Sequence, residues 1–180
     1  MVNNKYSRLC SAAFWERKFN ILFDNKIWSA TYQATKETRL LALQWKIIHN
    51  IYPTNILLSK MKIRDNKMCS FCPQEIDYIE HFLFDCRICQ PLWLHIENIL
   101  CVLLETRLHL DTKQVLFGIW DGSEFSRVQQ NLINLCLIIG KMCISKYKYG
   151  TPMHIQLMFD REFTLRKSQV PPRFHSYFEQ

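Results

Sequence analysis

The sequence predicts a mainly α-helical fold, a multi-helix array, on three observations. Apolar residues make up 48% of the 180 positions, enough to bury a core. Over most of the chain they recur at steps of three and four residues, which is the period of one helix face. Only four glycines occur, too few for a turn-rich β protein. Each expected helix follows from this periodicity and from the residues that begin or end it.

Apolar periodicity predicts helices, in chain order, over residues 14–23, 40–51, 55–60, 78–85, 91–103, 115–119, 125–149 and 152–167. Pro53 ends the second helix, and Thr54 can cap the third with its hydroxyl. Pro91 suits the first turn of the fifth helix, where its missing N–H costs nothing. Gly150 and Pro152 end the seventh.

These elements predict three parts along the chain. Residues 6–105 form a helical lead-in together with a central module, and residues 106–168 form a helical C-terminal extension. Residues 169–180, which include two adjacent prolines, are expected to be a loose tail. The letters DGSEF at 121–125 are a turn signal inside the extension.

The eight cysteines are expected to be reduced, in an intracellular protein of the nucleus or cytoplasm that is not secreted. The first residues lack the apolar core and cleavage site of a secretory signal. The longest apolar stretch, residues 132–144, is interrupted by Asn134 and Lys141 and is shorter than the roughly 20 residues that a membrane span needs. No membrane partner is therefore expected. Four thiols among apolar residues are predicted to be core side chains: Cys10, Cys101, Cys136 and Cys143.

The densest group of metal-binding residue types is Cys69, Cys72, His81 and Cys86, spaced C-x2-C-x8-H-x4-C. Two thiols at this spacing can bind one ion from a tight turn, and a His and a Cys can complete a tetrahedron. His81 and Cys86 would point about 140° apart on one continuous helix, so the helix must end between them. Such a site would hold one structural Zn²⁺, making a small Cys-Cys-His-Cys zinc knuckle between helices. Nearby carboxylates could hold the other imidazole nitrogen: Glu75, Asp77, Glu80 and Asp85.

A second ligand set competes with the first. Cys86 and Cys89 are also separated by two residues, so Cys69, Cys72, Cys86 and Cys89 form C-x2-C-x13-C-x2-C, close to a four-cysteine zinc ribbon. Spacing alone does not separate the two sets. Reduced cysteines without any metal are the third interpretation, disfavoured because this combination is hard to collect by chance.

The formal net charge of +7 favours polyanionic partners, although many basic domains simply have a solvated basic surface. One basic stretch leads directly into Cys69. A second, which includes tyrosines, ends the long helix near residue 149. Basic side chains beside aromatic ones suit single-stranded nucleic acid. The candidate nucleic-acid contacts are Lys60, Lys62, Arg64, Lys67, Lys146 and Lys148.

Several segments together resemble one family. They are FWERKF at 14–19, LQWKIIHNIYPTNILLSKM at 43–61, CSFC at 69–72, IEHFLFDC at 79–86 and QPLW at 90–93. This pattern resembles the zinc-binding region downstream of the polymerase in LINE-type (non-LTR) retrotransposon reverse transcriptases. Two later segments, LFGIW at 116–120 and GKMCISKYKYG at 140–150, resemble the sequence that follows this region.

The resemblance implies that Cys69, Cys72, His81 and Cys86 are the ligands and that Cys89 is a thiol at a helix start. It also implies a role in holding RNA template or target DNA near a polymerase. The polymerase signature is missing from this chain, because no two aspartates are adjacent, and no endonuclease precedes the region. An upstream polymerase domain is a possible partner if the chain belongs to a longer frame.

Three hypotheses follow. The first is a non-catalytic, zinc-stabilised nucleic-acid-binding module that takes no small-molecule substrate. The second is a protein-interaction or scaffold piece whose zinc only staples helices together. The third is a decayed retrotransposon fragment with no selected function.

Overall fold

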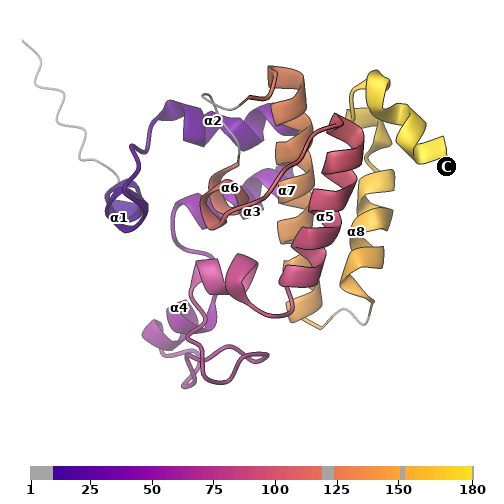
Figure 1. Ribbon diagram of the computed structural model, residues 1–180. Coiled ribbons are helices and arrows are strands. Elements are labelled where there is room, and N and C mark those ends of the chain that lie inside the picture. Colours follow the sequence, from indigo (N-terminus) through magenta and orange to yellow (C-terminus); the bar gives the residue numbers. More distant parts are fainter. Residues whose placement is uncertain (1–9, 119–123, 151–152, 180) are drawn as a thin grey trace, which may run out of the picture.

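The protein is mainly helical, which confirms the predicted fold class. A computed structural model describes residues 10–118, 124–150 and 153–179 (Figure 1). Within these residues the backbone forms no named strand, only an isolated antiparallel bridge between Met68 and Ile76. The α-helices are α1 (Cys10–Phe19), α2 (Asn25–Ala34), α3 (Thr38–Ile48), α4 (Asn55–Lys60), α5 (Gln90–Leu104), α6 (Thr112–Phe117), α7 (Arg127–Lys148) and α8 (Ile155–Thr164). Shorter turns are the π-helical η1 (His81–Asp85) and the 3-10 segments η2 (Lys167–Gln169) and η3 (Pro172–Glu179).

Helix α7 is the centre of the fold. Every residue from Leu132 to Ile144 is buried, and α2, α3, α5 and α8 pack against this helix. Helices α5, α7 and α8 run side by side (Figure 1). Gly140 allows α5 to approach closely, because a Cβ there would lie 2.8 Å from a ring carbon of Trp93. Among the described helices, none is long and apolar enough to cross a membrane.

A buried polar contact joins three helices. The ammonium of Lys141 on α7 donates to Gln44 Oε1 on α3 at 2.5 Å and lies 3.3 Å from the carbonyl oxygen of Leu116 on α6. Gln44 Nε2 donates to the same carbonyl at 2.8 Å. Burial lowers the pKa of Lys141 to about 7, because the charged form loses its hydration. Lys141, which interrupts the apolar stretch 132–144, and Gln44, on the buried face of α3, therefore satisfy each other.

One hydrophobic cluster spans both of the large parts that the sequence suggests. It includes Trp15 of the lead-in, Trp93 of the central module and Phe159 of the extension. The buried tryptophans are also satisfied as donors: Trp15 Nε1 donates to the carbonyl of Ile48 at 2.8 Å, and Trp93 Nε1 to that of Leu83 at 2.7 Å. The boundary near residue 105 stays a prediction, and α7 packs against helices from both sides of it.

The N-terminal helices differ from the prediction. The first helix ends at Phe19 and not near residue 23, because Asn20 takes a left-handed conformation with φ 51°. Helix α2 is an element that the periodicity argument missed. A cap marks its start, since the carboxylate of Asp24 accepts the backbone N–H groups of Lys26 at 2.9 Å and Ile27 at 3.3 Å. The helix predicted over residues 40–51 is α3, which ends at Ile48, three residues before the predicted end.

The expectation of a loose C-terminal tail was wrong for its described residues. Phe174 in η3 is buried, and the ring of Phe178 lies 5.0 Å from that of Phe163 on α8. Aromatic side chains thus hold the tail against α8. Figure 1 shows the C-terminal segment in yellow beside the end of that helix. Parts of other predictions lie outside the described residues, namely residues 6–9, 119, 121–123, 152 and 180.

Candidate metal centre

Cys69 and Cys72 lie in a tight turn between residues 68 and 76. The Met68–Ile76 bridge closes the turn, and the N–H of Cys69 donates to the carbonyl of Glu75 at 2.8 Å. The N–H of Phe71 donates to Cys69 Sγ at 3.4 Å. Backbone hydrogen bonds therefore hold this turn, which we call the knuckle turn (residues 68–76), with both thiols on one side.

His81 and Cys86 lie at the two ends of η1. The N–H of Cys86 donates to the carbonyl of His81 at 3.0 Å, a bond across five residues that defines a π-helical turn. The helix ends at Asp85, and Cys86 takes an extended conformation. The helix break that a shared ion requires is therefore present. The wider turn also brings the two side chains closer in direction than an α-helix would.

The four side chains converge. Their ligand atoms all lie within 4.8 Å of one another, and Cys86 Sγ lies 3.7 Å from the sulfurs of both Cys69 and Cys72. Zn–S bonds of about 2.3 Å in a tetrahedron give S–S edges of about 3.8 Å. A disulfide would require about 2.05 Å, and all described cysteines are free. Two of the three sulfur–sulfur distances therefore match the edge of a zinc tetrahedron.

The imidazole of His81 supplies an independent test of fit. Its Nε2 atom is buried and makes no hydrogen bond within the described structure. A buried polar atom without a partner costs free energy, and a metal ion would satisfy it. The residues present therefore fit a zinc ion, which four protein ligands would enclose with no open position.

Cys89, the alternative fourth ligand, lies outside this group. It is fully buried, and its Sγ lies 3.3 Å from the carbonyl oxygen of Phe82. A hydrogen bond between Cys89 and Cys86 raises the pKa of the Cys89 thiol and lowers that of Cys86. Cys86 is thus the better thiolate, whereas the Cys89 thiol donates to the carbonyl of Phe82.

Two of the four carboxylates expected to hold His81 have other partners. Glu80 pairs with Lys18 of α1, and Asp77 accepts the N–H of Asn55 at 2.9 Å. No hydrogen bond joins Glu75, Asp77, Glu80 or Asp85 to His81 in the described part of the chain. Asp77 instead caps α4, a task that the sequence assigns to Thr54, which makes no side-chain cap. Burial raises the pKa of Asp77.

The predicted basic contacts fall into two groups. Lys60, Lys62, Arg64 and Lys67 are all exposed beside the knuckle turn. The two lysines at the end of α7 have other partners. Lys146 forms an ion pair with Glu162 of α8. The Lys148 ammonium is buried 4.2 Å from the ring centre of Phe82 and makes no hydrogen bond within the described structure.

Lys148 faces the metal centre and not the solvent. It lines a small cavity with Cys69 and Asp77. Burial raises the pKa of Cys69, and the charge of Lys148 opposes that rise. The pKa of Cys86 is lowered chiefly by its contact with Cys89, and the charge of Lys148 adds to that lowering. The contact between Lys148 and nucleic acid stays a prediction, and the ammonium lies beside Phe82 instead of on the exposed surface. Sequence reasoning could not find this role, because Lys148 follows Cys86 by 62 residues and only packing of α7 against η1 brings them together.

Of the thiols predicted to be core, Cys136 and Cys143 are buried, and Cys101 is half-buried, with Sγ accepting the N–H of Leu108 at 3.3 Å. The side chain of Cys10 lies outside the described structure.

The chain matches one known family in its first half. Residues 8–93 match the family described as zinc-binding in reverse transcriptase. No curated protein matches the chain significantly. The matched span contains the knuckle turn, η1 and all four converging side chains, whereas Lys148 lies beyond it. Over residues 8–93, this chain therefore carries the zinc-binding region that is found in reverse transcriptases.

Proposed function

We propose that the chain is a non-catalytic nucleic-acid-binding module that one structural zinc ion stabilises, and that it holds RNA template or target DNA. The zinc would be bound by Cys69, Cys72, His81 and Cys86. Because the protein fills all four positions, the ion would organise structure and leave no site for substrate.

The observation that carries the proposal is how the exposed basic stretch is tied to the metal centre. Asn55, the first residue of α4, donates through Nδ2 to the carbonyl of Met68 at 2.7 Å. Arg64 donates to the Oδ1 atom of the same asparagine. Asn55 therefore joins α4, the basic stretch and the start of the knuckle turn. Zinc binding would hold Lys60, Lys62 and Lys67 in place as a phosphate-binding surface.

The test is fluorescence anisotropy of the zinc-loaded protein with single-stranded RNA or DNA at several salt concentrations. The affinity is expected to fall as salt rises, since phosphate contacts release counterions. Lys60→Ala together with Lys62→Ala should weaken binding. The slope of log affinity against log salt concentration should become shallower by up to about 0.7 for each lost phosphate contact.

The charge-matched control is Lys36→Ala with Arg107→Ala, which removes two exposed cations. Arg107 follows the far end of α5, about 22 Å of helix from the knuckle side. The control should bind almost as the unaltered chain does. Absence of binding at low salt by the zinc-loaded protein would overturn the proposal, and a salt-resistant complex with a protein partner would favour the scaffold alternative.

A further inference from the structure

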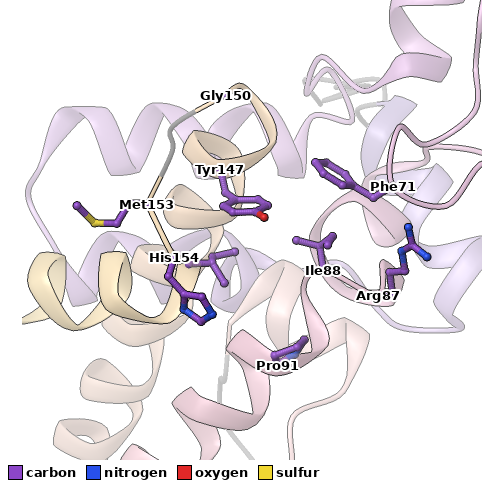
Figure 2. A pocket seen from close by; sticks show the side chains of 9 residues that line it. Phe71, Arg87, Ile88, Pro91, Tyr147, Gly150, Met153 and His154 are labelled. Atoms are coloured by element: carbon purple, nitrogen blue, oxygen red, sulfur yellow. The ribbon is translucent and has the colours of Figure 1, made fainter.

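A groove of about 600 Å³ lies beside the metal centre. The knuckle turn, the start of α5 and the facing ends of α7 and α8 line it. Figure 2 shows Phe71 and Arg87 on one side, Met153 and His154 on the other, and Tyr147 between them. Its volume is in the range of small-molecule binding sites in proteins.

Two aromatic rings form one wall of the groove. Phe71 lies between the first two cysteine ligands, and Tyr147 belongs to the last turn of α7. Their ring centres are 6.0 Å apart and their planes differ by 34°. Both side chains are only half-buried, so part of each ring is open to the groove (Figure 2). Ile88 and Ile155 add apolar surface. Flat apolar surface of this kind suits a planar aromatic ligand.

The charges around the groove favour an anionic ligand. Arg87 and His154 are exposed at its edges, and none of the described lining residues is a carboxylate. His154 precedes α8 without making a side-chain cap, so helix capping does not occupy its imidazole. The groove therefore combines a stacking surface with donors for phosphate or base edges.

We propose that this groove binds an unpaired base of single-stranded nucleic acid, stacked on Phe71 and Tyr147, with Arg87 contacting the backbone beside it. The inference rests on the proposed nucleic-acid binding and narrows it to single strands. A base inside a duplex keeps its faces covered by its neighbours, so it cannot reach the rings. Stacking uses the face that every base has, so little sequence preference is expected.

The experiment compares strands that differ in their bases. The zinc-loaded chain is titrated with a 12-nucleotide RNA, with DNA of the same sequence, with that DNA carrying abasic sites, and with a duplex. At one salt concentration, the intact single strands should bind about tenfold more tightly than the abasic strand and the duplex. We call this difference the base margin. Comparison of the RNA with the DNA shows which sugar the protein prefers. A base margin for either strand supports base binding in the groove.

Variants locate the margin in the groove. Phe71→Leu and Tyr147→Leu keep apolar volume but remove a ring face, so each should lose most of the base margin. The salt dependence should stay unchanged, because the phosphate contacts remain. Phe14→Leu is the matched control, since Phe14 is an exposed ring on α1. Zinc content is measured for each variant, so that loss of the knuckle is not mistaken for loss of stacking.

The outcomes separate this inference from the proposed function. Salt-dependent binding with no base margin, or a margin that survives both ring substitutions in zinc-loaded protein, overturns the groove and leaves nucleic-acid binding standing. Absence of binding to every strand at low salt overturns both.

Discussion

Cys86 and Cys89 are three residues apart, yet the structure gives them different surroundings. Cys86 Sγ lies 3.7 Å from two other sulfurs, whereas Cys89 Sγ lies beside the carbonyl of Phe82. Spacing could not separate them, because both satisfy a zinc pattern. Their roles differ because η1 turns Cys86 toward the knuckle turn, while Cys89 precedes α5 and is covered by the core.

Serine substitutions test this assignment. Cys86→Ser should lose the zinc ion, since a neutral hydroxyl replaces a thiolate ligand. Cys89→Ser should keep one zinc per chain, because a serine hydroxyl can still donate a hydrogen bond. Metal analysis of the purified proteins measures both. Zinc lost from Cys89→Ser but retained by Cys86→Ser would refute the ligand set.

Lys148 places a buried positive charge beside the thiolates. Zinc with three thiolates and a neutral imidazole carries a net charge of about −1. A nearby ammonium stabilises that charge, and the ring of Phe82 holds the ammonium from one side. The candidate centre and the ring of Phe82 therefore attract the ammonium of Lys148 from two sides.

Lys148→Met should therefore weaken zinc binding by about tenfold, which corresponds to about 1.4 kcal/mol. Competition with a chromogenic chelator measures the affinity. Lys146→Met is the matched control, because it removes a charge two residues away that pairs with Glu162. Equal zinc affinities of both variants, with helix content preserved by circular dichroism, would contradict the role of Lys148.

At the scale of elements, short irregular turns position the candidate ligands, and long helices form the core. The π-helical turn η1 sets the direction of two ligands, and Asp77 and Asn55 connect α4 to the same region. Helix α7 supplies the packing surface for α2, α3, α5 and α8. The contact between Lys141 and Gln44 fixes how α7 meets α3 and α6.

That contact predicts a pH dependence of stability. The folded pKa of Lys141 is lowered to about 7, while the pKa of an unfolded lysine is about 10.4. Between these values the unfolded chain binds more protons, so this residue makes the free energy of unfolding rise with pH. Below about pH 7 both states are protonated and its contribution stays at its lowest.

Lys141→Met should remove this rise, which can reach about 1.4 kcal/mol per pH unit. Urea unfolding of both proteins between pH 7 and pH 10 measures it, with the difference between the two curves isolating Lys141 from other titrating groups. Parallel curves across that window would show that Lys141 titrates normally in the folded protein.

In the whole molecule, the candidate metal centre lies between residues 69–86 and the end of α7. The candidate ligands come from residues 69–86. From the end of α7, Lys148 lines a cavity with Cys69, and Tyr147 lines a groove with Phe71. The family match covers residues 8–93 only, so the surroundings of the centre include residues beyond it. Zinc would thus stabilise the knuckle turn directly and the rest of the fold through α7.

Removal of zinc should partly unfold the protein. Structural zinc contributes on the order of 10 kcal/mol to small modules, but the helices around α7 have their own core. With chelator, amide hydrogen exchange should accelerate at Cys69 and Cys86, whose N–H groups are bonded within the centre, and remain slow in α7. Unchanged exchange at those two amides would contradict a structural metal.

Local signals in the sequence reached a good part of this structure. Three- and four-residue periodicity identified α3, α5, α7 and α8 to within a few residues at each end. Both ends of α4 were predicted at the observed residues. Helix α2 was missed although Asp24 marks its start. Its stability comes from packing on α7, which its own residue pattern does not reveal. The described tail was judged from its prolines, while its aromatic residues decided its position.

The helical class and the set of candidate ligand types could be predicted from the amino-acid order, because both depend on periodicity and spacing over fewer than about 20 residues. Spacing left Cys86 and Cys89 as alternatives, the family resemblance favoured Cys86, and the structure places Cys86 in the cluster. That Lys148 points inward and that Phe71 and Tyr147 share a groove is visible in the folded chain alone. The physical reason is distance along the chain. Those arrangements join side chains as many as 76 residues apart, as Phe71 and Tyr147 are, and burial against α7 selects them.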